Sequence, residues 1–91
     1  MSERARCRVV VHGNVQGVFF RDSCRREASS RGVAGWVTNR PDGAVEAVFE
    51  GEPGAVSAMV EWCSRGPRGA DVQSVDQGSG EPEGLSGFEI R

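Results

Sequence analysis

The pattern of residues along this chain changes from strand-like to helix-like at one stretch, Gly13-Asn14-Val15-Gln16-Gly17-Val18-Phe19-Phe20-Arg21. A run of β-forming residues, Cys7 to His12, leads into it, and a segment with helical spacing, Arg21 to Arg31, leads out of it. A glycine at each end of the loop lets the backbone turn sharply and lets a ligand approach closely. The stretch therefore predicts a strand, a short loop and a helix in succession.

The predicted loop has the features of an anion site. Backbone N–H groups from a loop that ends at a helix N-terminus converge on one point and favour negative charge there. Arg21 falls in the first helical turn, where the helix dipole disfavours a cation, and a bound anion would account for it. The alternative is a tight strand-to-helix turn with a surface arginine, and these residues alone leave both interpretations open.

Length and composition restrict the class of protein. The 91 residues predict a single domain over residues 1–91, and contents of 37% hydrophobic and 26% charged residues are typical of a globular chain. No apolar run approaches the ~18 residues of a membrane span, and residues 1–6 lack an apolar signal core. We therefore expect a cytoplasmic protein with no membrane partner.

Charge and cysteine usage exclude further classes of site. A net charge of −2 gives no general attraction to nucleic acid, and the absence of lysine excludes a Walker-type phosphate loop. Cys7, Cys24, Cys63 and His12 do not have the spacing of zinc ligands. We expect buried free thiols, no metal and no cofactor, and a structural role is favoured for His12.

Periodicity extends the prediction over the rest of the chain. Helices are predicted from about Phe20 to Arg31 and from Glu52 to the stop at Gly66-Pro67. The segment Gly78 to Gly87, rich in glycine, glutamate and proline, is predicted to be a loop. Strands are predicted at Ala5–His12, Val33–Asn39, Ala44–Glu50, Ala70–Gln77 and Phe88–Arg91, with a hairpin turn at Arg40-Pro41-Asp42-Gly43.

The same periodicity assigns the core. Glu46 and Glu50 fall on the face opposite the core. The predicted core positions are Cys7, Val9 and Val11; Phe20, Cys24 and Ala28; Val45, Ala47 and Phe49; and Val56, Met59, Val60 and Cys63.

The order β-α-β-β-α-β, followed by a short strand, predicts a ferredoxin-like α+β sandwich. Right-handed crossovers place both helices on one face of a mainly antiparallel sheet, with the first and third strands adjacent at its centre. The loop after the first strand then lies near the polar end of the second, so Arg21 and Asn39 are the predicted site pair. A guanidinium can hold a phosphoryl or carboxyl group and an amide can orient water, which suits phosphoryl transfer to water.

Two blocks of sequence resemble a known family. The stretch at residues 13–21 is similar to the acylphosphatase signature, and Gly35-Trp36-Val37-Thr38-Asn39-Arg40-Pro41-Asp42-Gly43 resembles its second block. The resemblance extends to Phe88-Glu89-Ile90-Arg91 and so covers nearly the whole chain. It departs from the family pattern in the first helix, at Asp22-Ser23 and at Arg31, which bears on the stability of that helix.

The resemblance implies hydrolysis of a small-molecule acyl phosphate to a carboxylate and phosphate, without a metal. Arg21 would clamp the phosphate, and Asn39 would position the attacking water. We expect the chain to act as a monomer. By the same resemblance, the phosphate would be held by backbone N–H groups of Val15, Gln16, Gly17, Val18 and Phe19.

Two other functions share this fold. One is a non-catalytic module that binds phosphate or carbamoyl phosphate, and the retention of both Arg21 and Asn39 favours the enzyme over it. The other is an RNA-binding sheet, which needs paired aromatic residues on its exposed strands. The first strand has no aromatic residue, and the third has only Phe49, on the predicted core face.

Overall fold

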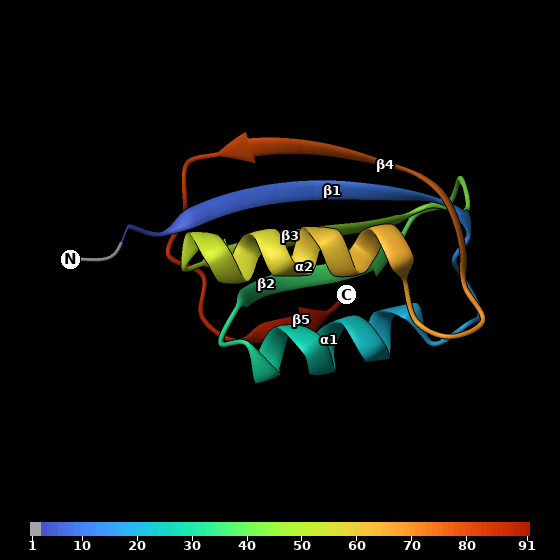
Figure 1. Ribbon diagram of the computed structural model, residues 1–91, viewed down its shortest axis with the longest axis horizontal. Coiled ribbons are helices and arrows are strands. Elements are labelled where there is room, and N and C mark those ends of the chain that lie inside the picture. The colour runs from blue at the N-terminus through green and yellow to red at the C-terminus, as the bar shows by residue number, and fades with distance from the viewer. Residues whose placement is uncertain (1–2) are drawn as a thin grey trace.

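The computed structural model describes residues 3–91 of the chain and contains two helices and five strands. The predicted order of elements is confirmed (Figure 1). In chain order they are β1 (Ala5–Asn14), α1 (Phe20–Ser30), β2 (Ala34–Asn39), β3 (Val45–Gly51), α2 (Pro53–Arg65), β4 (Asp71–Gly80) and β5 (Phe88–Ile90).

The strands form one sheet in the order β4-β1-β3-β2-β5. β1 and β3 are antiparallel neighbours in its interior, and β5 lies parallel to β2 at one edge. Both helices cover the same face of the sheet, as Figure 1 shows. This is the predicted ferredoxin-like arrangement, with the short final strand added beside β2.

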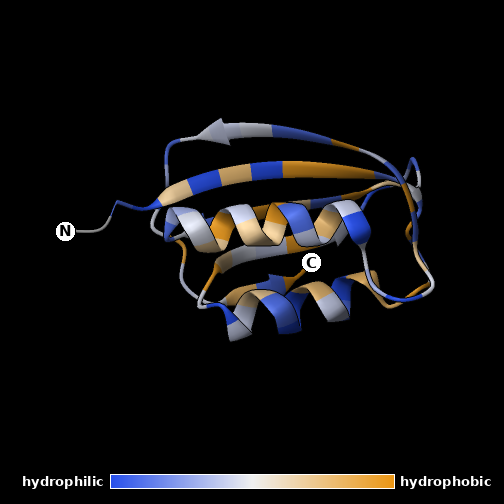
Figure 2. Cartoon of the chain, viewed as in Figure 1, coloured by the Kyte–Doolittle hydropathy of each residue, from blue (hydrophilic) through white to orange (hydrophobic). Residues whose placement is uncertain are grey.

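The core lies between the sheet and the two helices. Every predicted core position is buried except Val60, which is half-buried against the cluster. α1 contributes only its thin apolar stripe, and Figure 2 shows how much of its surface is hydrophilic. Phe20 and Trp62 join the helices by an edge-to-face contact, with ring centroids 5.3 Å apart. None of the helices in residues 3–91 has the length and apolar character needed to cross a membrane.

The polar residues of α1 are paired along the helix. The Asp22 carboxylate lies 3.3 Å from the Arg26 guanidinium, and Glu27 lies 3.6 Å from Arg31. Such pairs one turn apart contribute a few tenths of a kcal/mol each on an exposed helix. Asp22 and Arg31, two of the residues that depart from the family pattern in this segment, thus have ion-pair partners within it.

All three cysteines are buried free thiols, as predicted. Cys24 on α1 faces the neighbouring thiol of Cys63 on α2, and this neighbour, together with burial, raises the pKa of the Cys24 thiol. The two thiols act as small packing groups where the helices meet.

The prediction of a loop from Gly78 to Gly87 is wrong for its first three residues. Residues 78–80 continue β4, because they pair with Arg8, Cys7 and Arg6 of β1 in an antiparallel ladder. Backbone hydrogen bonds to a neighbouring strand have overridden the low strand propensity of glycine. At the other boundaries the differences are small; α1, for example, ends at Ser30, with Gly32 at a positive φ of 67° just beyond it.

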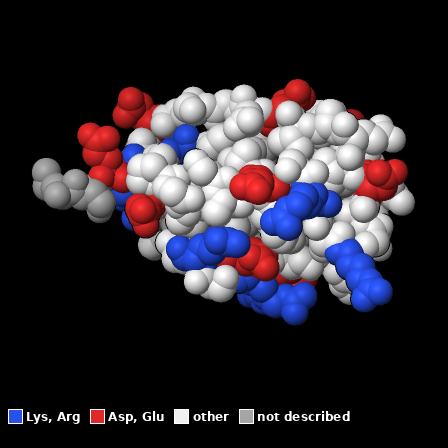
Figure 3. Space-filling view, in the orientation of Figure 1, with Lys and Arg blue, Asp and Glu red and all other residues white. Residues whose placement is uncertain are grey.

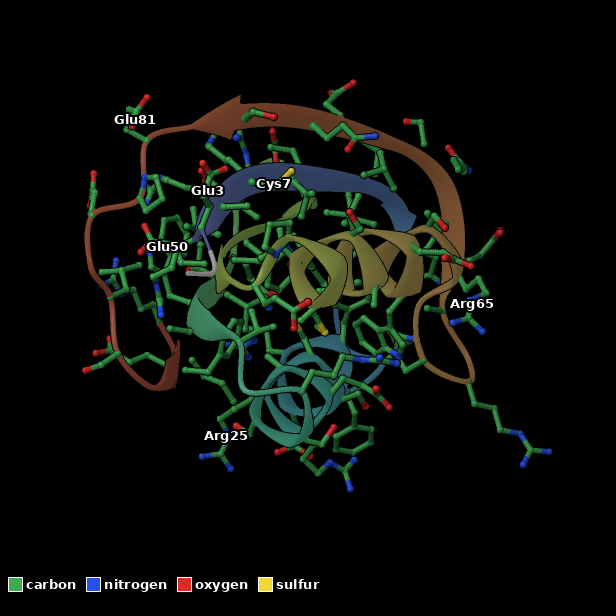
Figure 4. The ribbon with its side chains drawn as sticks, turned by 60° about the vertical axis from the view of Figure 1, so that its left-hand side comes forward. Glu3, Cys7, Arg25, Glu50, Arg65 and Glu81 are labelled. Carbon is green, nitrogen blue, oxygen red and sulfur yellow. The ribbon has the colours of Figure 1, made fainter. Side chains whose placement is uncertain are left out.

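Glu50 lies on the face opposite the core, as predicted, yet its side chain is fully buried. Its carboxylate lies 2.5 Å from the Arg6 guanidinium. It also accepts hydrogen bonds from the backbone N–H groups of Glu83, Gly84 and Leu85, at 2.8, 3.1 and 3.0 Å. Figure 4 shows Glu50 at the end of the molecule where the segment after β4 passes. One buried carboxylate therefore fastens the connection from β4 to β5.

The contacts of Glu50 set its ionisation. Burial opposes the charge, but the amide hydrogen bonds and the Arg6 guanidinium outweigh it and hold the pKa of Glu50 below its usual value. The unfolded chain then binds the additional proton. The stability that Glu50 contributes is present above the ordinary glutamate pKa of about 4.3 and is lost as pH falls through the lower folded value.

We predict that Glu50→Gln lowers the free energy of unfolding by about 3 kcal/mol at pH 7, because breaking a buried ion pair leaves its partner charge uncompensated. The difference between wild type and variant should shrink as the pH is lowered through the depressed pKa of folded Glu50, because the wild-type carboxyl then also becomes protonated. Urea denaturation over a series of pH values from 7 downward measures it. Glu46→Gln, on the same strand and face but less buried, is the matched control. An equal loss in the two variants would contradict the assignment.

Candidate functional site

Two connections meet at the right-hand end of the molecule in Figure 1. They are the segment from β1 to α1 and the turn from β2 to β3. Between them lies a pocket of about 310 Å³ that holds both Arg21 and Asn39. Its lining residues are Val15, Gly17, Phe19, Phe20, Arg21, Asp22, Asn39 and Ile90. The structure thus brings together the two predicted site residues and most of the predicted loop, whereas the side chains of Gln16 and Val18 face elsewhere.

Glycine is favoured at the two ends of the loop for different physical reasons. Gly13 follows a bulge in the pairing of β1 with β4, and a Cβ there would lie 2.1 Å from the backbone oxygen of Asp71. Gly13 therefore permits a close approach of two backbones. Gly17 has open space around it but a φ of +76°, so its backbone angle is what favours glycine.

Phe19 is the one non-glycine residue within residues 3–91 with a positive φ. It has φ 60° and ψ 27°, a left-handed conformation that costs an ordinary residue about 1–2 kcal/mol. It occupies the N-cap position of α1 and gives the helix no side-chain cap. The first-turn N–H groups of α1, which a capping side chain would normally engage, are therefore left open at the pocket.

Arg21 carries an unpaired charge into this pocket. Three arginines within residues 3–91 are half-buried; Arg6 and Arg40 pair with carboxylates, while Arg21 forms no ion pair or side-chain hydrogen bond there. Figure 3 shows arginine side chains gathered along the lower edge of the molecule, where Figure 1 places α1. A half-buried, unpaired guanidinium beside open backbone N–H groups favours a bound anion.

Asn39 ends β2, opposite Val45. It is half-buried, and its side-chain amide has no hydrogen-bond partner within residues 3–91. The sequence alone left open a purely local role for this asparagine beside the turn. Because the turn is held by other groups, the Asn39 amide is available to a small polar ligand in the pocket.

The Gln16 side chain ties the loop to the hairpin turn. Its Nε2 donates to the backbone oxygen of Arg40 at 2.7 Å and to that of Ala44 at 2.9 Å. The turn is closed by its own bonds, with Ala44 N–H donating to the Asp42 carboxylate at 3.0 Å. That backbone bond lowers the pKa of Asp42, aided by the nearby Arg40.

The role of the Gln16 side chain was missed from the sequence, where Gln16 entered only as a backbone donor. Its partners lie 24 and 28 residues further along the chain. The one local signal was an amide side chain set among the apolar residues of the loop.

The remaining polar candidate lies outside the pocket. The His12 ring nitrogen Nε2 lies 3.0 Å from the Asp76 carboxylate on the neighbouring strand, in an exposed pair. The structural role favoured for His12 stays a prediction. Among the described residues, no group of three or more His, Cys, Asp and Glu side chains is arranged to hold a metal ion.

A family model, curated relatives and a solved structure point to one family. The family model for acylphosphatase matches residues 7–90. An acylphosphatase of Rubrobacter xylanophilus is 58% identical over 94% of this chain and 79% of its own length, and one of Haloquadratum walsbyi is 54% identical over 100% and 99%. The structure of an acylphosphatase from Coxiella burnetii superposes with a TM-score of 0.92 at 39% identity, covering 97% of this chain and 93% of that one.

We predict that Gln16→Leu lowers the free energy of unfolding by about 1–3 kcal/mol, because two carbonyl oxygens lose a half-buried donor. The substitution should also weaken the binding of inorganic phosphate in the pocket, since the loop is no longer fixed to the turn. Urea denaturation measures the first effect, and calorimetric titration with phosphate measures the second. Gln73→Leu, an exposed amide on β4, is the control. A Gln16→Leu protein as stable as this control would contradict the link.

Proposed function

Because this chain belongs to the acylphosphatase family, we propose that it hydrolyses acyl phosphates to a carboxylate and inorganic phosphate. One observation carries the proposal at this site: the unpaired Arg21 guanidinium and the free Asn39 amide line the same pocket, beside the open start of α1. The first suits the anion of the substrate and the second suits a water molecule. A mixed anhydride has a good leaving group, so positioning and electrostatics are sufficient means of catalysis.

The phosphoryl group is the end of the substrate that enters the loop. Backbone N–H groups of residues 15–19 and the Arg21 guanidinium hold its oxygens, and the charge that spreads over them in the transition state is stabilised there. The Asn39 amide holds a water in line with the bond to be broken. The water oxygen bonds to phosphorus, and the carboxylate leaves with the electron pair of the P–O bond.

The proton of the attacking water goes to a phosphoryl oxygen. Among the described residues no histidine lines the pocket, and the one acid that lines it, Asp22, faces Arg26 at 3.3 Å. The substrate therefore serves as its own base. This route uses no metal and no cofactor.

We propose further that the protein works as a monomer in the cytoplasm. The groups that the proposed mechanism uses, Arg21, Asn39 and the loop backbone, all belong to one chain, so the mechanism itself needs no second copy. Three free thiols fit a reducing compartment.

The proposed activity is tested with benzoyl phosphate in the presence of excess EDTA. We expect sustained hydrolysis at the same rate with and without the chelator. Activity that is lost with EDTA and returns with magnesium or zinc would contradict the metal-free mechanism. Phosphate binding without any turnover would instead identify a binding module of the same fold.

The roles of Arg21 and Asn39 predict different kinetic effects. Arg21 meets an anion in both the ground and the transition state, so Arg21→Gln should raise KM and also lower kcat, with a loss in kcat of about 10³ or more. Asn39 is proposed to hold water, so Asn39→Ala should lower kcat by about 10²–10³ and leave KM nearly unchanged. Steady-state kinetics on benzoyl phosphate distinguish the two patterns.

The matched control for Arg21 is Arg25→Gln on the next turn of α1. Figure 4 shows Arg25 pointing from the helix into solvent, so its loss should change neither constant by more than about twofold. Circular dichroism verifies that each variant is folded. A folded Asn39→Ala protein with wild-type kcat would exclude the water-positioning role.

A further inference from the structure

The two large apolar side chains that the described residues expose most lie at this pocket. Phe19 is 80% exposed and Ile90 is 40% exposed, and both line the pocket with Arg21 and Asn39. Single exposed apolar side chains are ordinary on protein surfaces. Two of them gathered at the mouth of one pocket indicate an apolar contact with a ligand.

Packing does not explain the residue at position 19. Its left-handed backbone would suit glycine or asparagine better than phenylalanine. Its ring gains almost no burial in return, because four-fifths of it faces solvent. A strained residue whose side chain packs against little within its own chain indicates a partner outside it.

Ile90 is held beside Asn39 by the register of β5. Ile90 pairs with Val37, which shares a face of β2 with Asn39 because side chains alternate along a strand. The next residue fixes this register: the Arg91 N–H donates to the Val37 oxygen at 2.8 Å, and Thr38 Oγ1 donates to the Arg91 oxygen at 3.0 Å. Ile90 is therefore presented at the pocket by a firmly paired strand.

The pocket consequently has two kinds of wall. Arg21, Asn39 and the loop backbone form a polar wall for the phosphoryl group, whereas Phe19 and Ile90 stand at the mouth, where the rest of the substrate leaves the pocket. Its volume of about 310 Å³ lies at the small end of the range for ligand sites, which suits an acyl group with a single ring.

We propose that Phe19 and Ile90 form an apolar lip that binds the acyl group, so that the protein favours acyl phosphates with an aromatic or similarly bulky apolar acyl group over short ones. The inference rests on the proposed function and assigns the acyl half of the substrate. Covering about 55 Å² of apolar surface is worth about tenfold in affinity, so benzoyl derivatives should exceed acetyl derivatives by at least that factor.

The test uses binding as well as turnover. Benzoylphosphonate and acetylphosphonate, in which a C–P bond removes the hydrolysable link, are titrated calorimetrically, and kcat/KM is measured for benzoyl and acetyl phosphate. We expect wild type to prefer the benzoyl member about tenfold or more in both measurements. Phe19→Gly, which suits the left-handed backbone and adds no capping side chain, and Ile90→Ala should each reduce that preference about fivefold.

Two control variants and one further measurement show whether a loss of preference comes from the lip itself. Phe19→Tyr keeps the ring and should keep the preference, and Val60→Ala, a half-buried truncation on α2 outside this pocket, should not change it. The inhibition constant for inorganic phosphate reports on the loop, and we expect it to stay within about twofold in Ile90→Ala. A benzoyl preference that is unchanged in both lip variants would contradict the proposed lip. A preference that falls only as much as the affinity for inorganic phosphate falls would contradict it as well. Failure of wild type to hydrolyse either acyl phosphate would overturn the proposed function. The phosphonate affinities would still show whether Phe19 and Ile90 bind the acyl group.

Discussion

The two hydrogen bonds of the Gln16 side-chain amide are the interaction on which the pocket depends. The pocket is assembled from a loop after β1 and a turn before β3, and Gln16 joins them by donating to the Arg40 and Ala44 carbonyl groups. Both N–H bonds of its NH2 group are used. A neutral amide can do this beside an anion site without adding charge there. A lysine in its place would add a charge between the loop and the turn, and a carboxylate would repel the two carbonyl groups.

A second polar anchor lies at the other end of β3. Ala44, just before this strand, receives the bond from Gln16, and Glu50, near its end, holds Arg6 and three backbone N–H groups of the β4–β5 connection. The apolar middle of β3 packs into the core. The central strand thus positions the loop at one end and, through the connection that leads to β5, the mouth of the same pocket. Distant parts of the chain contribute to one small site because they are all fastened to β3.

Much of this was predictable from the sequence because it follows from periodicity. The alternation in β1 and the stripes of both helices specify the core, and the order of elements then places Arg21 near Asn39 by topology alone. What escaped prediction depends on partners distant in sequence. Glu50 has the spacing of a solvent-facing residue, and only the returning segment buries it. The left-handed backbone of Phe19 could not be read from a residue type that ordinarily avoids that conformation.

The unusual start of α1 has a thermodynamic consequence. A helix with no side-chain cap and a thin apolar stripe lacks the means by which short helices are normally stabilised. On the proposed function, the bound anion takes the place of the cap, so binding and the ordering of this helix become a single equilibrium. Phosphate, the product, is then also a folding ligand, and the free energy by which it stabilises the chain grows with the logarithm of one plus the ratio of its concentration to its Kd. A serine or aspartate at position 19 would fill the same place from within the chain, and stability gained by the helix would be affinity lost by the site.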